Sequence, residues 1–584
     1  MKYHIEYAKY KYGRITAVGW LTGDTPEIPT FIWAEDAMGR RLDCSVERRE
    51  REDVRAAVFP EDTGGLFGFR ICFAVAEGTA FFLCVSDGER TNRCRTDTRR
   101  VSATGRIPDS RKAQLKETWR SLIRKDSPEG KPVVSPYGDT DRQTASSESR
   151  RGSTPLFSII VPACNTQGEH LADMLESVMG QTYDSWEICL ADGSARSLRE
   201  SCEEDQSLLG RTLAGYLTDP RVRYRHLPSN LGISGNSNEA LAMACGEYTV
   251  MLDHDDILTP DALACVAGML AKQPEADFIY SDSDLTDHDY LYCYNPLFKP
   301  EWSPQMLYSA NYITHLSVIR TDLLRELGGF RSSCDGAQDW DLFLRVGERT
   351  DRIYRIPRIL YHWRAAEGST ARGVEEKPYA RRAQLASVQG HLDRMGIAGR
   401  AVFEDRAGTC IRVELSAREH RGDVVLCTAP GVILSEEAAA ELRAWAGVPG
   451  IGVVCPRVAD EKGRIVSQGV LLCGDGPEAL FAGSYPGTAN ALGHTDWYRN
   501  HVAAEPFCYA VSRQAWEEVG PPDEKLGPLA MVDFCLRMEE AGYRTLMTPF
   551  AQVTGEQSIA QAIRKEALAA YKKRIKRYQA EERR

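Results

Sequence analysis

Asp253, Asp255 and Asp256 stand within four residues, directly after the apolar run 248–252. Carboxylates this close repel one another unless a cation or hydrogen bonds compensate their charge. Oxygen ligands of this kind suit Mg²⁺ or Mn²⁺, which commonly also bind substrate phosphates. The alternative is an acidic cluster that caps the helix expected to begin near Pro260. The segment therefore predicts either a divalent-cation site or a helix start.

Further polar residues follow three other apolar runs that we expect to be buried strands. Asn165, Asp192 and Asn230 each stand after one such run, and helical patterns separate the runs. Alternation of strand and helix at this spacing is typical of a doubly wound α/β sheet, in which ligands bind at the carboxyl ends of the strands. We therefore expect these side chains to share one site with the acidic segment.

We expect five segments along the chain. The strands and helices that position these residues lie in the third of them. Residues 1–105 contain short alternating apolar runs with turn signals between them, which predicts an all-β accessory domain, a small sandwich or barrel. Residues 106–154 are expected to form a helix and a flexible linker rich in Ser, Pro, Gly, Asp and Arg. The central α/β domain takes up 155–396. A smaller α/β domain follows at 397–556, and a basic helix at 557–584.

The composition argues against several classes of protein. The chain has 584 residues and a formal net charge of -11, whereas general nucleic-acid binding depends on cationic contacts to phosphates, so we expect no nucleic-acid partner. No apolar stretch reaches the roughly 18 residues of a membrane-spanning helix, and the N-terminus lacks the apolar centre of a signal peptide. The 17 cysteines are scattered without a C-x-x-C pair, which favours a reducing compartment, the cytoplasm.

Several short motifs carry a specific resemblance. Four of them are FSIIVPACNT at the start of the α/β domain, LADGS ending at Ser194, NLGISGNSNEAL beginning at Asn230, and LDHDDIL around Asp255. YSDSD, FKPEWSP, GGFR, DGAQDWDLFLR and YHWR follow in order before residue 365. Together they resemble bacterial family 2 glycosyltransferases in the branch that builds O-antigen and related surface polysaccharides. The resemblance implies a GT-A fold for 155–396, Rossmann-like with a mostly parallel sheet.

The resemblance also assigns roles to individual residues. Those that would line the nucleotide-sugar site are Pro162, Asn165, Asp192, Asn230, Gly232, Asn236 and Asp253. Asp253 and Asp255 match the family's DxD pair, and His362 matches a histidine that approaches the metal or the diphosphate in some relatives. Asp339 matches the catalytic base. The alternatives are a satisfied, half-buried imidazole for His362 and a helix N-terminal charge for Asp339.

These roles together imply an inverting, metal-dependent glycosyltransferase. It would move a sugar from a nucleotide diphosphate donor to a growing surface polysaccharide or a lipid-linked saccharide. Mn²⁺ or Mg²⁺ would stabilise the departing diphosphate, and a carboxylate would take the acceptor proton. One rival interpretation is an inert scaffold that binds carbohydrate or nucleotide sugar. The other is an α/β enzyme that makes or cleaves the diphosphate bond, which would need a Gly-rich basic loop after the first strand.

An internal repeat follows the α/β domain. The stretches 320–345 and 512–537 share one pattern of apolar and charged residues. When they are aligned on their final Leu-Arg, Asp533 matches Asp341, and the apolar Met531 takes the place of the expected base. We therefore expect the smaller α/β domain to be a degenerate, glycosyltransferase-like copy.

The last segment, 557–584, combines an apolar i,i+4 stripe with five basic residues between 572 and 577. A basic amphipathic helix of this kind can lie on an anionic membrane, where a lipid-linked acceptor would be located. The alternative is a solvated helix packed on the protein. The first interpretation predicts peripheral membrane contact at the inner face of the cell membrane.

Overall fold

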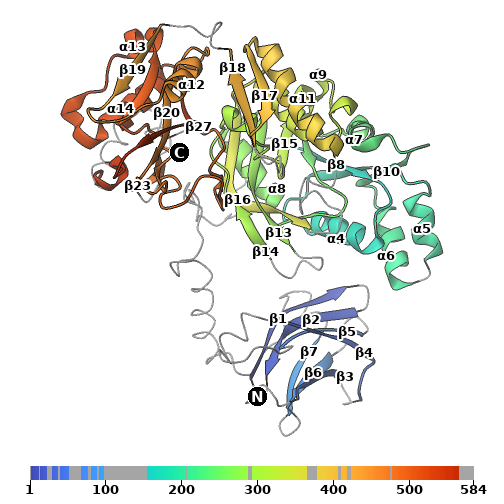
Figure 1. Ribbon diagram of the computed structural model, residues 1–584. Coiled ribbons are helices and arrows are strands. Elements are labelled where there is room, and N and C mark those ends of the chain that lie inside the picture. The colour runs from blue at the N-terminus through green and yellow to red at the C-terminus, as the bar shows by residue number, and fades with distance from the viewer. Residues whose placement is uncertain are drawn as a thin grey trace. The chain divides into compact units, whose positions relative to one another are not determined.

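The computed structural model (Figure 1) describes residues 2–11, 14–22, 29–36, 40–50, 67–75, 80–87, 91–97, 154–205, 207–286, 293–364, 378–404, 410–416, 423–473, 476–500, 502–564 and 568. The expected helix and linker before residue 154 and most of the expected basic helix lie outside these residues. The chain divides into two compact units, Met1–Val134 with Glu203–Thr212 and Ser135–Cys202 with Leu213–Arg584.

The described strands between residues 2 and 97 form two antiparallel sheets, of order β1-β2-β5-β4 and β3-β6-β7. Their bounds are β1 (Lys2–Lys11), β2 (Arg14–Thr22), β3 (Phe31–Asp36), β4 (Cys44–Arg49), β5 (Gly68–Ala74), β6 (Ala80–Ser86) and β7 (Thr91–Asp97). Phe73 of one sheet meets Phe81 of the other edge-on, with ring centroids 5.2 Å apart. Both rings belong to one core, as expected where alternate residues of two sheets face each other.

A nine-stranded sheet forms the centre of the second unit, in the order β10-β9-β8-β11-β15-β13-β16-β12 with β14 beside β13. Its strands are β8 (Phe157–Ala163), β9 (Trp186–Asp192), β10 (Val222–His226), β11 (Tyr248–Met251), β12 (Ile257–Leu258), β13 (Phe278–Thr286), β14 (Cys293–Leu297), β15 (Ser317–Arg320) and β16 (Ile353–Arg364). β8 and β9 are buried along their whole length, as their continuous apolar sequences predict.

Helices connect and cover these strands (Figure 1). The α-helices are α4 (Gly168–Met179), α5 (Leu198–Glu204), α6 (Leu208–Tyr216), α7 (Gly232–Met243), α8 (Ala262–Lys272), α9 (Thr321–Glu326), α10 (Gln338–Gly347) and α11 (Pro378–Met395). Two short 3₁₀ helices are η1 (Pro304–Tyr308) and η2 (Ser332–Cys334). The alternation of strand and helix up to α8 agrees with the sequence pattern.

The expectation of a mostly parallel sheet is wrong for the second half of this sheet. β10, β9, β8 and β11 are parallel neighbours. β15, however, is antiparallel to both β11 and β13, and β12 and β14 also pair antiparallel. The remaining pair, β13 with β16, is parallel. Periodicity could not reveal this change, because a short buried apolar run has the same sequence signature in either direction.

A five-stranded sheet follows in the C-terminal region, of order β19-β26-β20-β21 with β27 beside β20. The strands of this region are β17 (Gly399–Phe403), β18 (Ile411–Leu415), β19 (Val424–Thr428), β20 (Ile451–Ala459), β21 (Ile465–Ser467), β22 (Val470–Cys473), β23 (Gly476–Ala479), β24 (Ala489–Asn490), β25 (Gly493–His494), β26 (Cys508–Ser512) and β27 (Arg544–Thr554). Its helices are α12 (Glu436–Ala446), α13 (Arg513–Val519), η5 (Glu524–Leu529), α14 (Ala530–Glu540) and η6 (Ile559–Gln561).

The two sheets repeat one arrangement of strands. β19, β26, β20 and β27 pair in the directions antiparallel, antiparallel and parallel. β11, β15, β13 and β16 pair in the same sequence of directions. In both cases a short helix follows the second strand and a longer one precedes the last, α9 and α10 in the first set and α13 and α14 in the second.

An ion pair recurs on the longer helix of each set. On α10, Arg345 Nε donates to Asp341 at 2.7 Å, and the other guanidinium nitrogens donate to two carbonyl oxygens just after α9. On α14, Arg537 Nε donates to Asp533 at the same 2.7 Å, and its other nitrogens donate to two carbonyl oxygens at and just after the end of α13. These two matched aspartates therefore serve the fold, because each pair fixes the turn between two helices.

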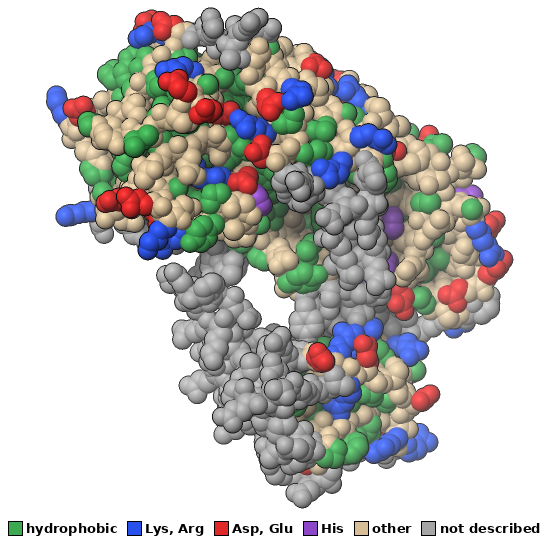
Figure 2. Space-filling model, viewed as in Figure 1, with side chains coloured by type: hydrophobic (Ala, Val, Ile, Leu, Met, Phe, Trp, Pro, Cys, Tyr) green, Lys and Arg blue, Asp and Glu red, His purple; other side chains and the backbone are tan. Residues whose placement is uncertain are grey.

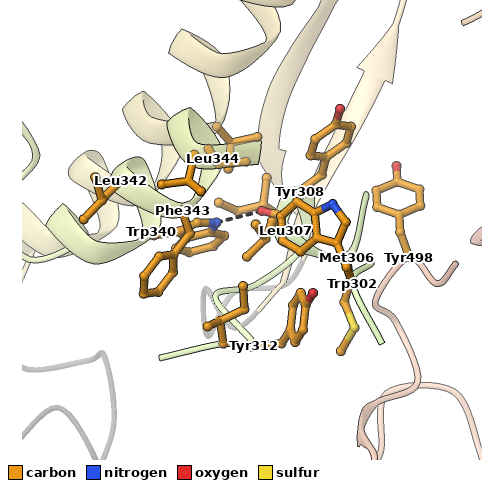
Figure 3. Close-up of a cluster of buried hydrophobic side chains, with 14 of the residues drawn as sticks. Trp302, Met306, Leu307, Tyr308, Tyr312, Trp340, Leu342, Phe343, Leu344 and Tyr498 are labelled. Atoms are coloured by element: carbon orange, nitrogen blue, oxygen red, sulfur yellow. Dashed lines mark hydrogen bonds between the residues drawn. The ribbon is translucent and has the colours of Figure 1, made fainter. Parts of the chain in front are cut away.

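The two sheets of this unit share one continuous hydrophobic core (Figure 3). Tyr308, from the first set of elements, stacks on Trp445 of α12 with ring centroids 6.0 Å apart. Trp445 in turn meets Tyr498 edge-on at 5.0 Å. The expected boundary at 396–397 thus separates two stretches of sequence that pack within one compact unit.

On the visible surface, basic and acidic side chains are interspersed (Figure 2). Exposed ion pairs of this kind are screened by water and contribute about 0–1 kcal/mol each. The pairs that matter for stability are therefore the buried ones. Within the described residues, no helix has the length and apolar character needed to cross a membrane.

Candidate active site

A cavity of about 980 Å³ lies at the carboxyl ends of β8, β11 and β13. Its lining includes Pro162 from β8, Gly232 from the start of α7, Asp253 after β11, and Asp339 from α10. This is the place where the sheet changes from parallel to mixed pairing, and its size suits a small-molecule ligand. Four of the residues singled out from the sequence therefore meet in one cavity.

Asp253 lies opposite His315, just beyond the paired ends of β11 and β15. β11 and β15 are antiparallel with Met251 opposite Ser317, and continuing this register places residue 253 opposite residue 315. The distance from Asp253 Oδ2 to His315 Nε2 is 3.5 Å. Burial alone would lower the pKa of His315, but the charges of Asp253 and Asp339 outweigh burial and raise it. Burial would likewise raise the pKa of Asp253, but the charge of His315 outweighs it and lowers that pKa.

His315 was not among the candidates from the sequence, although it lines the cavity. Its ring stacks on Tyr361 with centroids 4.7 Å apart and an angle of 15° between the planes. Trp363 lies edge-on to the same ring at 5.7 Å. No motif or spacing points to this histidine. Only the antiparallel register between β11 and β15 brings it to Asp253, and that register depends on the strand order.

The acids after β11 occupy different surroundings. Asp256 is 5% exposed, and its carboxylate accepts hydrogen bonds from the Tyr361 hydroxyl at 2.7 Å and the Arg364 backbone N–H at 2.8 Å. Asp256 thus ties the acidic loop to β16. Burial raises the pKa of both Asp255 and Asp256 above the usual aspartate value. A bound cation would relieve such a concentration of negative charge.

The capping alternative for these acids is wrong. α8 begins at Ala262, and the residue in the capping position is Asp261. Asp256 is instead held by β16, and Asp253 faces the cavity. An N-cap side chain has to lie immediately before the first turn to reach its free N–H groups, and the acidic segment ends too early for that.

Asp339 lies in the first turn of α10 and lines the cavity. Its Oδ2 accepts a hydrogen bond from Asn311 Nδ2 at 2.7 Å, and its Oδ1 accepts one from the Trp340 backbone N–H at 2.8 Å. Burial raises the pKa of Asp339, which suits a carboxylate that has to accept a proton. Asp341 is 1% exposed and bonded to Arg345, so the two neighbouring carboxylates have separate surroundings.

Asp192 is fully buried at the end of β9 and is not among the described residues that line the cavity. Its oxygens accept hydrogen bonds from the backbone N–H groups of Ser194 and Leu198 at 2.9 and 2.8 Å, and from the Tyr224 hydroxyl at 2.7 Å. Asp192 thus shapes the loop after β9. Asn165 is exposed, and its backbone N–H donates to Ser194 Oγ at 2.7 Å. Direct nucleotide contacts from both residues stay predictions.

Asn230, Gly232 and Asn236 form one hydrogen-bonded turn at the start of α7. Asn236 is 3% exposed, and its amide donates to Asn230 Oδ1 at 3.1 Å and to the Ala163 carbonyl at 3.4 Å. The turn is thus attached to the end of β8. Gly232 has φ +77°, and a Cβ there would lie 2.6 Å from a carboxylate oxygen of Asp335. Only glycine fits this position without strain.

His362 lies on β16 opposite Asp284 of β13. Its Nδ1 is 2.5 Å from Asp284 Oδ1 and 3.6 Å from Cys293 Sγ. Burial would lower the pKa of His362, but its bonds to Asp284 and Cys293 outweigh burial and raise it to about 10. Asp284 lines the cavity, whereas His362 is not among its lining residues in the described part of the chain. Metal-ligating histidines commonly donate their other ring N–H to a carboxylate, and Asp284 would be that carboxylate if Nε2 of His362 bound a metal.

A buried charge cluster supports one wall of the cavity. The side chains of Asp282 and Arg355 have 0% exposure and form an ion pair of 2.7 Å. Lys299 is also fully buried, its backbone N–H donates to Asp282, and its Nζ donates to the carbonyl oxygens of Ile313 and His315. Burial lowers the pKa of Lys299 to about 7. The cluster thus fixes the backbone that carries His315.

Comparison with known families and proteins gives consistent matches. Residues 158–328 match the family described as Glycosyl transferase family 2. An uncharacterized protein, y4gI, of Sinorhizobium fredii is 30% identical over 69% of this chain and 53% of its own length. The O-antigen biosynthesis protein RfbC of Myxococcus xanthus is 34% identical over 44% of this chain and 20% of its own length. The chain thus spans about half or less of the length of these two relatives.

Shorter relatives and solved structures also match. The putative colanic acid biosynthesis glycosyl transferase WcaA of Escherichia coli is 28% identical over 33% of this chain and 67% of its own length. Among solved structures, S. aureus TarS in complex with UDP is 19% identical and covers 40% of this chain and 65% of its own length, with a TM-score of 0.30.

Proposed function

We propose that this chain, which contains a family 2 glycosyltransferase domain at residues 158–328, transfers a sugar from a nucleotide diphosphate donor to a hydroxyl group of a saccharide. The observation that carries the proposal is that Asp253 and Asp339 line the same cavity. One site thus offers a carboxylate for a cation and another for a proton. The names of the O-antigen and colanic acid relatives support a growing surface polysaccharide or a lipid-linked saccharide as acceptor.

We propose Mn²⁺ or Mg²⁺ as the bound metal; among the described residues, the His, Cys, Asp and Glu side chains whose ligand atoms lie within 4.8 Å of one another are Asp284, Cys293 and His362. Asp253, Asp255 and His362 would hold it, because carboxylate oxygens and one imidazole nitrogen suit these ions. Burial raises the pKa of Asp255 and the charge of Asp253 raises it further; a cation would compensate that neighbouring charge. When bound, the metal supplies positive charge that stabilises the departing diphosphate.

Asp339 would act as the base in a single displacement. The acceptor oxygen forms a bond to the anomeric carbon while the bond from that carbon to the diphosphate oxygen breaks. The hydroxyl proton passes to a carboxylate oxygen of Asp339. Asn311 holds this carboxylate in place through its 2.7 Å hydrogen bond. Attack from the face opposite the leaving group inverts the anomeric configuration.

The direct test is a screen of UDP-, GDP- and dTDP-sugars with Mn²⁺ or Mg²⁺ that measures released nucleoside diphosphate. We expect release with one donor, loss of release in excess EDTA, and recovery when the metal is restored. Release that persists in EDTA would contradict the metal. Donor binding without release, in the presence of polysaccharide acceptors, would favour the inert scaffold.

Replacing Asp284 with asparagine is expected to weaken Mn²⁺ binding by about 10–100-fold. The carboxylate holds Nδ1 of His362, and a neutral amide oxygen would hold the ring more weakly. Calorimetric titration of the full chain with Mn²⁺ measures the affinity. Cys293→Ser is the matched control, because it alters the same cluster without removing a carboxylate. Equal affinity in Asp284→Asn and the wild type would remove His362 from the ligand set.

We also propose that the reaction takes place in the cytoplasm, at the inner face of the cell membrane. The sequence at 557–584 supports this, because its basic residues would be attracted to anionic lipid. Flotation with vesicles of phosphatidylglycerol and phosphatidylcholine tests the proposal. Binding should require the anionic lipid and decrease with salt. Equal flotation with neutral vesicles would contradict it.

A further inference from the structure

The segment 298–316, between β14 and β15, carries two groups that reach the carboxylates of the cavity. Asn311 donates to Asp339 at 2.7 Å, and His315 lies 3.5 Å from Asp253. The regular structure within this segment is the short helix η1. A long connection with so little secondary structure depends on contacts with its surroundings for a fixed conformation.

Part of this support comes from residues that precede the C-terminal region. Lys299 Nζ donates to the backbone of Ile313 and His315. The Trp340 indole N–H donates to the Leu307 carbonyl at 2.7 Å (Figure 3). These bonds hold the end and the middle of the segment. None of these bonds reaches residues 303–305 or 309.

Asn500, from the C-terminal region, binds the beginning of η1. Its Oδ1 accepts hydrogen bonds from the Ser303 hydroxyl at 3.1 Å and the Gln305 backbone N–H at 3.2 Å. Its own backbone N–H donates to Ser303 Oγ at 3.0 Å. Its Nδ2 donates to the Thr545 carbonyl of β27 at 3.0 Å, which anchors the side chain to the C-terminal sheet. Asn500 is 2% exposed, so water does not compete for these bonds.

Ser309 receives a second pair of bonds from the same side. The Tyr498 backbone N–H donates to Ser309 Oγ at 3.2 Å, and the Ile411 backbone N–H donates to the Ser309 carbonyl at 3.0 Å. The Tyr498 ring belongs to the buried cluster that also contains Tyr308 (Figure 3). Ser309 stands two residues before Asn311. Its position therefore limits where the Asn311 side chain can lie.

We propose that the C-terminal region positions the segment 298–316, with Asn500 as the positioning residue, so that Asn311 and His315 stay on the carboxylates of the cavity. The effect on turnover rests on the proposed function. The proposal gives the C-terminal sheet a role that requires no chemistry of its own, which agrees with the apolar Met531 at the place of the base. We call the hydrogen bonds of Asn500 to Ser303 and Gln305 on one side and to Thr545 on the other the Asn500 bridge. The proposal requires the bonds on both sides.

Hydrogen exchange of the full chain tests the positioning without any substrate. In Asn500→Ala, the backbone N–H groups of residues 309–316 should exchange about 10–100-fold faster, because the Ser303 hydroxyl and the Gln305 N–H lose their acceptor and the segment before 309 loses its attachment to the C-terminal sheet. Ser558→Ala is the matched control. It removes a buried hydrogen bond to Glu505 inside the C-terminal region and should leave exchange at 309–316 unchanged. Equal exchange at 309–316 in both variants would overturn the proposal.

Turnover then tests the consequence for chemistry. At a temperature well below unfolding, kcat of Asn500→Ala should fall by about 10–100-fold while the donor KM stays the same. Ser303→Ala, on the other end of the bridge, should have the same effect, and the double variant should be no worse than either single one. If the losses of kcat in the two single variants added in the double variant, the proposal would be overturned. It would also be overturned if kcat of Asn500→Ala equalled that of Ser558→Ala. If the wild type turns over no donor, the proposed function fails, and the exchange result still decides the positioning.

Discussion

Replacing Asp339 with asparagine is expected to lower kcat by about 10²–10⁴-fold and to leave donor binding intact. The amide has nearly the same shape but cannot take up the acceptor proton. Asp339 lines the cavity and its carboxylate is oriented by Asn311 and the Trp340 backbone. Release of nucleoside diphosphate at saturating donor and acceptor gives kcat, and calorimetry gives the donor affinity.

Asp322→Asn is the control for this variant, because it removes an exposed carboxylate that pairs with Arg325 on α9. Its kcat should equal that of the wild type. Wild-type turnover in Asp339→Asn would exclude Asp339 as the base. Loss of donor binding together with kcat would show instead that Asp339 shapes the donor site.

The pH dependence of the rate adds an independent check on Asp339. Burial raises the pKa of this carboxyl, and a base works only when it is deprotonated. The rate should therefore rise with pH through a pKa above the usual aspartate value and level off beyond it. In Asp339→Asn this acidic limb should disappear from the residual activity. An acidic limb at the same pH in both proteins would assign it to another group.

Replacing Asp282 with asparagine is expected to lower the free energy of unfolding by about 3–5 kcal/mol. The change removes the 2.7 Å ion pair of the Arg355 guanidinium, which has 0% side-chain exposure, and Lys299 is buried beside it. Urea unfolding followed by tryptophan fluorescence measures the loss. Arg221 and Asp219 form an exposed pair, so Asp219→Asn should change stability by less than about 1 kcal/mol. If both variants lost the same free energy of unfolding, the buried pair would contribute no more to stability than the exposed one.

The sequence predicted the residues that could do chemistry better than it predicted the residues that hold them in place. The sequence points to Asp253 and Asp339 because each stands in a motif that resembles the family, LDHDDIL and DGAQDWDLFLR. The structure brings both to one cavity. Asp192 was placed at the right strand end, but the pattern could not show that Tyr224 and two backbone N–H groups occupy its oxygens. Hydrogen-bond partners distant in sequence leave no periodic signal.

His315 and Asn500 illustrate what sequence reasoning missed. His315 meets Asp253 only because β15 is antiparallel to β11, and apolar runs do not encode strand direction. Asn500 contacts Ser303, 197 positions earlier, through packing between two sheets. Such contacts follow from tertiary arrangement, which local propensity does not determine. The same reason explains the wrong expectation of a mostly parallel sheet.

The matched pairs Asp341–Arg345 and Asp533–Arg537 have a consequence for how this architecture tolerates mutation. Both pairs fix a turn, but an acid two residues earlier is present only at Asp339, where Met531 is its counterpart. A saturation library sorted for folding alone should therefore be intolerant at 341 and 533. Sorting the same library for product should add selection at 339 and none at 531. Relaxed selection would thus let the second half drift chemically while its architecture is retained.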